Sequence, residues 1–341
     1  MSKKIVKTNK NSLLIRGTTL NLKKLKPLKF ITHSDSFHAD EIIATAFLLE
    51  VYNDRDVELV RSRDMNVIET GDIVYDVGFV CDPKKKRFDH HMATFTETFN
   101  DKYNVKLSSA GLIFKYYHKE LFTKKFNFNC YTKEVQEFIT DKIYREYFLP
   151  ADALDNGYDF HYDLLGIESA RPRSIQDMVA AYNVHFIESA KNYEAVQLTN
   201  FSRALEMVRE DLKNYLSFIF ESYACEMEEA MREIKENKNK NIFIPNKNYN
   251  RSLLQDLLDN HDEVKFVIFT KGKNYRIYAV NKKGKQFETR CPLKKEWRGT
   301  RDEELQKISG ISEITFVHAT GFTGGASTLE AAIKMCEESM K

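Results

Sequence analysis

Short apolar runs alternate with helical stretches in the first half of the chain. Runs at residues 29–32, 57–60 and 73–77 are each typical of a buried strand. Apolar residues at helical spacing occupy 41–52 and again 107–122. Strand–helix–strand alternation of this kind predicts an α/β fold whose parallel sheet is covered by helices on both faces. In such sheets ligands bind at the carboxyl ends of the strands.

Further helices are predicted from capping residues and from apolar spacing. Ser108 and Ser109 open the helix at 107–122, and either hydroxyl can accept a hydrogen bond from its first, unpaired amides. No proline occurs between Pro172 and Pro245, so one or two long helices are expected to fill this stretch. Within it, apolar residues recur at helical spacing and predict packing in the core or between domains: Phe201, Leu205, Val208, Leu212, Leu216 and Ile219.

The last hundred residues follow a polar, Lys- and Asn-rich break at residues 236–250. Two paired strands are expected at 264–270 and 275–280, joined by a turn that contains glycine. Another strand is predicted at 313–318, followed by a glycine-rich turn at 321–325 and a closing helix. This order predicts a second, smaller α/β domain.

Composition and charge restrict the classes of function and the compartments that are possible for this chain. The net charge of +2 gives no global attraction to nucleic acid, so any polyanion must bind to a local basic patch. No apolar run approaches the roughly 18 residues of a membrane-spanning helix. The five cysteines lie far apart, which excludes a Cys-x-x-Cys zinc site and fits a reducing compartment.

Four short segments each place His or Asp at, or just after, the end of a predicted strand. Their residues are His33, His38 and Asp40, then Asp76, then Asp89, His90 and His91, and finally Asp152 and Asp155. Carboxylates that converge at the rim of a sheet repel one another and lose hydration, which costs several kcal/mol each. Divalent cations remove that cost. The sequence therefore predicts a metal site.

The ligand types restrict the metal. Imidazole and carboxylate groups without thiolate suit Mn²⁺ or Mg²⁺, with Co²⁺ or Zn²⁺ as alternatives. Two ions that share a bridging carboxylate can activate water and stabilise the departing oxygen of a phosphodiester. Isolated strand-end acids are often only turn or cap residues, and adjacent histidines can be a solvated loop, but four such segments in order favour the metal hypothesis.

These segments resemble the DHH phosphoesterase superfamily, and more closely its branch named after the melanocyte proliferating gene, formerly the UPF0160 family. The resemblance extends from about Lys29 to the end of the chain. It is carried by THSDSFHADE (Thr32–Glu41), VRSRD (Val60–Asp64), DIVYDVG (Asp72–Gly78), RFDHHMATFTETF (Arg87–Phe99), KLSSAGLIF (Lys106–Phe114), ADALDNG (Ala151–Gly157), WRGTRDEEL (Trp297–Leu305) and FVHATGFTGGASTLEAA (Phe316–Ala332).

The resemblance assigns roles to individual residues. It implies metal ligation by His33, His38 and Asp40 in the first motif, and by Asp76 as the carboxylate that bridges both ions. The eponymous triplet supplies His90 and His91, with Asp89 orienting an imidazole. The fourth motif supplies Asp155 or, as an alternative that the sequence leaves open, Asp152.

Two positions depart from the family pattern. Asp35 stands where the family has glycine in the first motif, which adds a carboxylate beside the site. Ala326 stands where a His or Asn usually follows the two glycines of the last motif. The second change puts the fine contacts to substrate in doubt, although not the metal chemistry.

Candidate substrate contacts lie in three places. Backbone amides of the glycine-rich turn (Gly321, Gly324 and Gly325) can cradle a phosphate, with His318 as a nearby donor. Arg298 and Arg301, beside the single Trp297, can clamp phosphates or stack on a base, or can instead form surface salt bridges with Asp302 and Glu303. Arg61 and Arg63 follow the second predicted strand, and we expect one of them to bind phosphate and the other to lie on the surface.

The resemblance implies a domain plan and an activity. The plan is a basic N-terminal extension (1–28), a DHH-type metal-binding catalytic domain (29–190), connecting helices (191–240) and a substrate-binding domain (241–341). The extension is expected to be a solvated tail, with a targeting segment as the alternative. The implied activity is metal-dependent 3′-to-5′ exonuclease action on RNA. The alternatives are a phosphatase for small nucleotides or pyrophosphate, and an inactive RNA-binding or regulatory protein.

The same expectations extend to location and partners. The chain is expected to be intracellular and soluble, with nuclear or mitochondrial placement implied by the resemblance and the cytoplasm as an alternative. An RNA or nucleotide substrate is the expected partner, and no membrane is expected. The sequence does not specify the oligomeric state.

Overall fold

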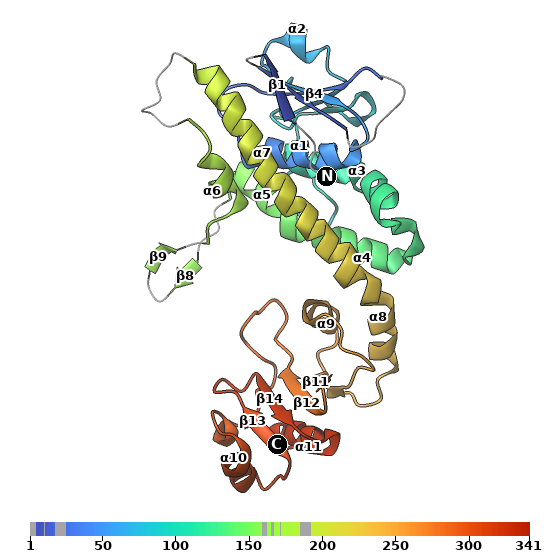
Figure 1. Ribbon diagram of the computed structural model, residues 1–341, viewed down its shortest axis with the longest axis vertical. Coiled ribbons are helices and arrows are strands. Elements are labelled where there is room, and N and C mark those ends of the chain that lie inside the picture. Colours follow the sequence, from blue (N-terminus) through green and yellow to red (C-terminus); the bar gives the residue numbers. More distant parts are fainter. Residues whose placement is uncertain are drawn as a thin grey trace. The chain divides into compact units, whose positions relative to one another are not determined.

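The computed structural model describes residues 5–9, 11–17, 25–158, 162–164, 167–170, 172–184 and 192–341. The chain divides into two compact units, Met1–Ser217 and Phe218–Lys341, which are described separately (Figure 1). Both are built from sheets and helices, so the predicted α/β class is confirmed at that level.

The first unit contains a seven-stranded sheet among its described residues, in the order β1-β2-β4-β3-β5-β7-β6. Its strands are β1 (Ile5–Asn9), β2 (Ser12–Ile15), β3 (Leu28–Thr32), β4 (Val57–Arg61), β5 (Ile73–Tyr75), β6 (Cys81–Asp82) and β7 (Arg87–Phe88). The neighbours β4-β3-β5-β7 pair in parallel, whereas β1, β2 and β6 join antiparallel at the edges. The sheet is therefore mixed, with a parallel centre.

The N-terminal stretch differs from expectation where β2 forms. Residues 12–15 pair with β4, and the side chains of Leu13 and Ile15 are buried. The prediction of a solvated tail is wrong for this stretch, because its apolar residues cover the edge of β4 that would otherwise be unpaired.

The helices of the first unit surround one strongly apolar element. They are α1 (Ala39–Val51), α2 (Met65–Ile68), α3 (Ser109–Phe126), α4 (Lys133–Ile143), α5 (Leu149–Asp155), α6 (Ile175–Ala180) and α7 (Tyr193–Ser217), with a π-helical turn at Tyr144–Phe148 and 3₁₀ turns at Pro83–Lys85 and Phe128–Cys130. Every residue of α1 is buried, and α1 packs against α3 and α7, which crosses it (Figure 1). A small hairpin joins β8 (Tyr162–Leu164) and β9 (Ile167–Ala170).

The predicted apolar stripe of α7 is confirmed as packing. Phe201, Leu205, Val208, Leu212 and Leu216 are all buried. The start of α3 differs from expectation, because the Ser108 hydroxyl makes no capping bond to its own helix. It donates instead to Asp152, and the Ser109 hydroxyl donates to Asp40. The amides at this helix end bind a carboxylate from another helix.

The second unit contains a five-stranded sheet in the order β10-β11-β12-β14-β13. Its strands are β10 (Ile242–Phe243), β11 (Phe266–Lys271), β12 (Asn274–Ala279), β13 (Ile314–Val317) and β14 (Thr323–Ala326). The predicted pairing of β11 with β12 around the turn is confirmed, with Lys271 opposite Asn274. The helices are α8 (Met227–Glu236), α9 (Arg251–Leu258), α10 (Asp302–Ser309) and α11 (Leu329–Ser339), with a π-helical turn at Phe218–Tyr223 and 3₁₀ turns at Ala224–Glu226 and Lys295–Trp297.

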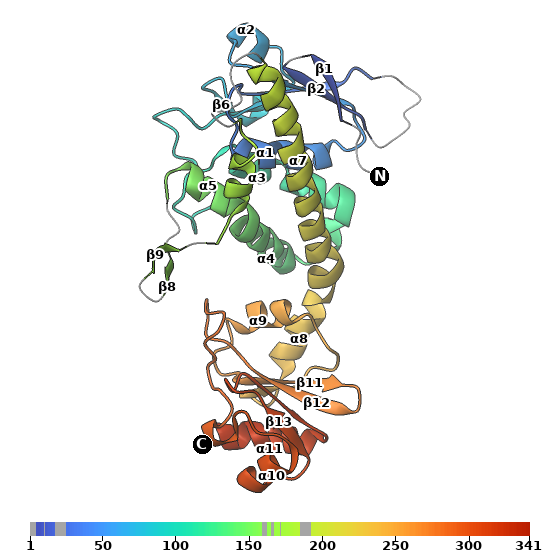
Figure 2. The ribbon, with the colours of Figure 1, turned by 60° about the vertical axis from the view of Figure 1, so that its left-hand side comes forward.

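Figure 2 shows α10 and α11 on one side of this sheet and α9 on the other. Ile277, Trp297, Leu305 and Met335 belong to the apolar core on the α10 and α11 side.

The glycine-rich segment differs from the predicted turn. Gly324 and Gly325 lie within β14, which pairs with β12 on one side and β13 on the other, so only Gly321 remains in a turn. A side chain at Gly324 would meet Leu293 at 2.7 Å, and one at Gly325 would meet Phe316 at 2.6 Å. Close packing across a central strand therefore explains these two glycines, and their amides do not form a turn that cradles an anion.

Candidate metal centre

Residues from three neighbouring strands and two helices meet at one edge of the first sheet. His33 follows β3, Asp76 follows β5, and Asp89, His90 and His91 follow β7. Because these strands are parallel and adjacent, their carboxyl ends lie side by side. Helix α1 adds Asp40 and Glu41 from its first turn, and α5 adds Asp155 as its last residue. Four groups of these side chains lie close enough together to hold a cation: His33/His38/Glu41, Asp76/His90/His91, Asp40/His90/Asp155 and Asp40/Glu41/Asp76.

Asp76 occupies the centre of this cluster. Its Oδ2 lies 3.2 Å from His33 Nε2, and its Oδ1 lies 3.1 Å from His90 Nε2. Burial opposes the charged form, but the hydrogen bonds from His33 and His90 hold the pKa of Asp76 below its usual range. Asp76 is therefore a buried carboxylate ion with imidazoles on both of its oxygens.

The backbone at Asp76 is unusual. Its φ of 59° lies in the left-handed region, which costs energy for any residue but glycine and is best tolerated by Asp and Asn. The Asp76 amide still donates to Phe88 O at 3.1 Å, so the pairing with β7 continues through this residue. The sheet thereby holds a strained residue at the point where the imidazoles meet.

Asp40 carries an unsatisfied oxygen. Its Oδ2 accepts from Ser109 Oγ at 2.8 Å, but its Oδ1 is buried and has no hydrogen-bond partner among the described residues. Burial, followed by the charges of Asp76, Asp155 and Glu41, raises the pKa of Asp40 well above its usual range. A buried acceptor without a donor, among other acids, is the environment that a cation relieves.

The His33 ring has a defined orientation. Its Nδ1 lies 2.8 Å from Ser34 O, so Nδ1 carries a proton and donates it to that carbonyl. Its Nε2 lies 3.0 Å from Glu41 Oε1. Burial disfavours protonation, but Glu41 and Asp76 raise the pKa of His33 to about 11. Because Nδ1 donates to a carbonyl, a cation would bind at Nε2 and displace the proton there.

Asp89 holds the triplet together. One of its oxygens lies 2.6 Å from His91 Nδ1 and accepts from the amides of His90 and His91, while the other accepts from Phe79 N at 2.6 Å. These bonds orient the His91 ring, whose side chain is 51% exposed, whereas His90 is 8% exposed. His90 therefore faces the acids, and His91 lies at the open side.

The two aspartates of α5 have different surroundings. Asp155 Oδ2 lies 3.5 Å from His90 Nε2. Asp152 is fully buried and accepts from Ser108 N and Oγ, Gly111 N and Tyr144 OH. A side chain at Gly111 would lie 2.2 Å from an Asp152 oxygen, so glycine is required there. Asp152 thus caps α3, and Asp155 is the acid of this helix that points to the cluster.

His38 and Glu41 belong to the part of the cluster around His33. The Glu41 carboxylate accepts from His38 N at 2.9 Å, which caps α1, and also faces His33. Glu41 was not among the predicted ligands, although it follows Asp40 directly in the first motif. The sequence feature that could have identified Glu41 is the adjacent pair of acids, Asp40 and Glu41, at the start of a predicted helix.

The two arginines after β4 differ sharply. Arg61 is buried, donates to Asp35 O at 2.9 Å and lies over the rings of Phe37 and Phe201. Arg63 is 59% exposed and lies 3.1 Å from His33 Nδ1. Arg61 therefore fixes the first-motif loop, and Arg63 is the one that is accessible to an anion beside the cluster.

Asp35 also has a physical explanation. Its φ of 71° is a conformation that favours glycine, and its side chain is 64% exposed and lies 3.7 Å from Arg63. The carboxylate therefore lies at the surface and pairs with Arg63.

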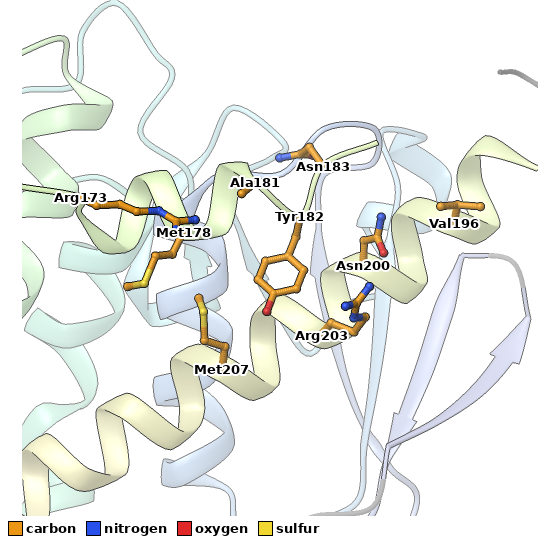
Figure 3. Close-up of a pocket in the computed structure, with 9 residues that line it drawn as sticks. All are labelled: Arg173, Met178, Ala181, Tyr182, Asn183, Val196, Asn200, Arg203 and Met207. Atoms are coloured by element: carbon orange, nitrogen blue, oxygen red, sulfur yellow. The ribbon is translucent and has the colours of Figure 1, made fainter. Parts of the chain in front are cut away.

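Sequence reasoning missed two polar residues that support the first-motif loop. Asn183 accepts from Phe37 N at 3.0 Å and donates to Phe37 O at 2.8 Å, and Gln197 donates to Asn183 at 3.1 Å. Asn183 also lines a hollow of about 490 Å³ between α6 and α7, in which Arg203 lies over the Tyr182 ring at 5.4 Å (Figure 3). No local motif marks these residues, because Phe37 lies 146 positions from Asn183 and Asp35, to whose carbonyl Gln197 also donates, lies 162 positions from Gln197.

The predicted substrate residues of the second unit are placed as follows. Arg298 Nε donates to Leu293 O at 2.9 Å and packs on the backbone at Gly321. Arg301 is exposed and lies over the Phe316 ring at 5.5 Å. His318 is exposed, and its Nδ1 accepts from Thr320 N at 3.2 Å, which leaves Nε2 as the ring donor.

The first unit is thus an α/β sheet domain with a buried His and carboxylate cluster suited to divalent cations. The family model described as Uncharacterised protein family (UPF0160), or MYG1_exonuc, matches residues 29–340. The chain belongs to this MYG1 family. It is 35% identical over 322 residues to the MYG1 protein of Dictyostelium discoideum, covering 91% of this chain and 96% of the relative.

Mammalian relatives are similar over comparable lengths. The chain is 33% identical to the MYG1 exonuclease of Homo sapiens, covering 93% of this chain and 87% of the relative. It is also 33% identical to the MYG1 exonuclease of Bos taurus, covering 93% and 85%. No described helix is long and apolar enough to cross a membrane.

Proposed function

We propose that this protein is a metal-dependent nuclease that hydrolyses phosphodiester bonds, with RNA shortened from its 3′ end as the reaction. The observation that carries the proposal is the position of Asp76, a buried carboxylate whose two oxygens face two different imidazoles. A carboxylate in that position can serve two cations at once. The names of the mammalian relatives support an exonuclease.

Two divalent ions, Mn²⁺ or Mg²⁺, fit these residues. His33, His38, Asp40, Asp76, His90 and Asp155 are the proposed ligands, with Glu41 as an addition that the structure motivates. When bound, such ions lower the pKa of a water molecule and neutralise the charge that develops on the leaving oxygen. Asp40 Oδ1, which has no hydrogen-bond partner in the described part of the chain, favours cation binding. So does the raised pKa of Asp155, which is caused by burial and by Asp76 against the opposing charge of His90.

The remaining residues have proposed roles around the reacting phosphate. Asp89 fixes the His91 ring, so that its exposed side can donate to a phosphate oxygen. Arg63 can offer its guanidinium to the same phosphate, since it is exposed beside His33. Both groups would neutralise negative charge on the reacting phosphate. The proposed parentage in the DHH superfamily rests on this same order of motifs.

The test is product analysis with defined substrates. The protein with Mn²⁺ is incubated with a 5′-labelled RNA, and in parallel with a dinucleotide and with pyrophosphate. A ladder of progressively shorter labelled products supports 3′-to-5′ action on RNA. Turnover of only the two small substrates would overturn the exonuclease in favour of a small-nucleotide phosphatase, and no turnover of any would overturn enzymatic activity.

A further inference from the structure

One face of the second unit's sheet carries aromatic rings and arginines. The side chains of β12 alternate, so Ile277 lies in the core with α11, whereas Arg276 and Tyr278 lie on the opposite face. We call this opposite surface the aromatic–arginine face. Its members are Phe269, Tyr278, Phe316 and Phe322 with Arg251, Arg276 and Arg301.

The arginines of this face lie over rings and not against acids. Arg276 and Arg301 lie 4.5 and 5.5 Å from the centre of the Phe316 ring. Arg251 lies 3.9 Å from the centre of the Tyr278 ring. Within the described ranges, none of the three guanidinium groups forms an ion pair. Their charge is therefore available to an anionic ligand.

A cavity of about 620 Å³ opens on the same face beneath α9. Its floor includes Phe269 and Tyr278, whose rings meet edge to face at 5.5 Å, and His318 lines its edge. Phe287 also lines it and is 88% exposed. A flat aromatic ligand can stack on such a floor, while an exposed phenyl ring beside it would gain burial.

The loop that carries Phe287 is basic. Lys282, Lys283 and Lys285 precede it, and Glu288 is the acid that pairs with two of these lysines. The cavity therefore combines aromatic walls with Arg251 in its lining, and the loop beside it carries a net positive charge. This combination suits a ligand that has both a flat ring and a negative charge.

We propose that the aromatic–arginine face binds single-stranded oligonucleotide, with one nucleobase in the cavity at Tyr278 and phosphates at Arg251, Arg276 and Arg301. Aromatic platforms flanked by unpaired arginines bind single strands because unstacked bases expose their π faces, which a duplex hides. The choice of nucleic acid as the ligand rests on the proposed function. The site itself rests only on the second unit.

The test measures affinity without cleavage. The full chain with Asp76→Asn is titrated against a fluorescently labelled 12-nucleotide RNA, the matching DNA strand and the corresponding duplex, and Kd is obtained from anisotropy. We expect Arg251→Gln and Phe287→Ser to weaken single-strand binding about tenfold each, since stacking and cation–π contacts at such sites have this size. Both side chains are exposed, so neither change threatens folding.

The matched control is Lys334→Gln. Lys334 is exposed on α11, the helix that packs on the other face of the sheet, and its loss removes the same unit of charge. An unchanged Kd in both Arg251→Gln and Phe287→Ser, or equal affinity for duplex and single strand, would overturn the proposal. Failure of the proposed function has a separate readout, namely that the chain with Asp76 intact does not hydrolyse bis(p-nitrophenyl) phosphate, a phosphodiester without a base.

Discussion

The metal-centre cluster of the first unit and the aromatic–arginine face of the second are opposites in charge and in exposure. The cluster gathers buried acids, with Asp40 and Asp76 almost inaccessible to solvent. The face gathers arginines over rings, with Arg251 and Arg301 exposed. A group of buried acids needs a cation and repels a phosphate, whereas unpaired arginines attract one.

This contrast assigns different tasks to the two regions. The first is built for chemistry, because its side chains are fixed by hydrogen bonds, such as those that Asp89 accepts from His90 and His91 and the one that Ser34 O accepts from His33. The second is suited to holding a strand, because Phe287, Arg251 and Arg301 are exposed and the arginines of the face form no ion pair within the described part of the chain. With a net charge of +2, the chain has no global field to do this instead.

The sharpest way to break the contrast is Asp76→Asn. Loss of the central negative charge should lower RNA hydrolysis in Mn²⁺ about 1000-fold, since it removes several kcal/mol of charge stabilisation. Single-strand affinity should stay within about twofold, because the aromatic–arginine face is unaltered. Initial rates, anisotropy and thermal unfolding check this. Asp101→Asn, an exposed change of equal charge, is the control, and near-normal rates in the Asp76 variant would refute the metal assignment.

The next prediction separates the two acids of α5. Asp155→Asn should lower hydrolysis about 100-fold with little change in stability, because its carboxylate faces His90. Asp152→Asn should keep the rate within about tenfold, because that carboxylate faces Ser108, Gly111 and Tyr144. Steady-state kinetics at saturating Mn²⁺ distinguish them. The reverse pattern would make Asp152 the ligand.

Sequence alone could not separate Asp152 from Asp155. The two lie three residues apart on one helix, and their partners come from Ser108, 44 positions earlier, and from His90. The strand-end acids were easier to identify, because parallel strands bring their carboxyl ends together whatever the loops do. Local pattern therefore located the cluster, but long-range contacts assign its individual acids.

The second unit was harder to predict for the same reason. Glycines at 324 and 325 indicated a turn, yet both lie within β14. Leu293 and Phe316 pack so closely against them there that no side chain would fit. The aromatic–arginine face has no motif, since Arg251, Arg276 and Phe316 lie on separate elements and meet only through strand pairing. Likewise, pairing of residues 12–15 with β4 overrode a lysine-rich, tail-like composition.

Asp152 also predicts a pH effect confined to the first unit. Burial raises the pKa of Asp152 to about 7, against the opposing bonds from Ser108, Tyr144 and Gly111. Between pH 5 and 6.5 the unfolded chain has lost this proton and the folded chain retains it, so stability falls as pH rises, by about 2 kcal/mol. Asp152→Asn removes this slope. Urea unfolding of both proteins in EDTA gives the difference, and parallel pH curves would refute the assignment.

The smallest expected effect concerns salt and distinguishes the aromatic–arginine face from the cluster by charge alone. Three phosphate contacts should give log Kd of the single strand a slope near 2 against log salt, and Arg251→Gln should lower that slope by about 0.7. Phe287→Ser should weaken binding without changing the slope, because stacking releases no counterions. Anisotropy titrations between 50 and 200 mM salt measure both. If the salt dependence of Kd falls equally in the two variants, Arg251 does not contact phosphate while Phe287 stacks on a base. The aromatic–arginine face then binds by general electrostatic attraction instead.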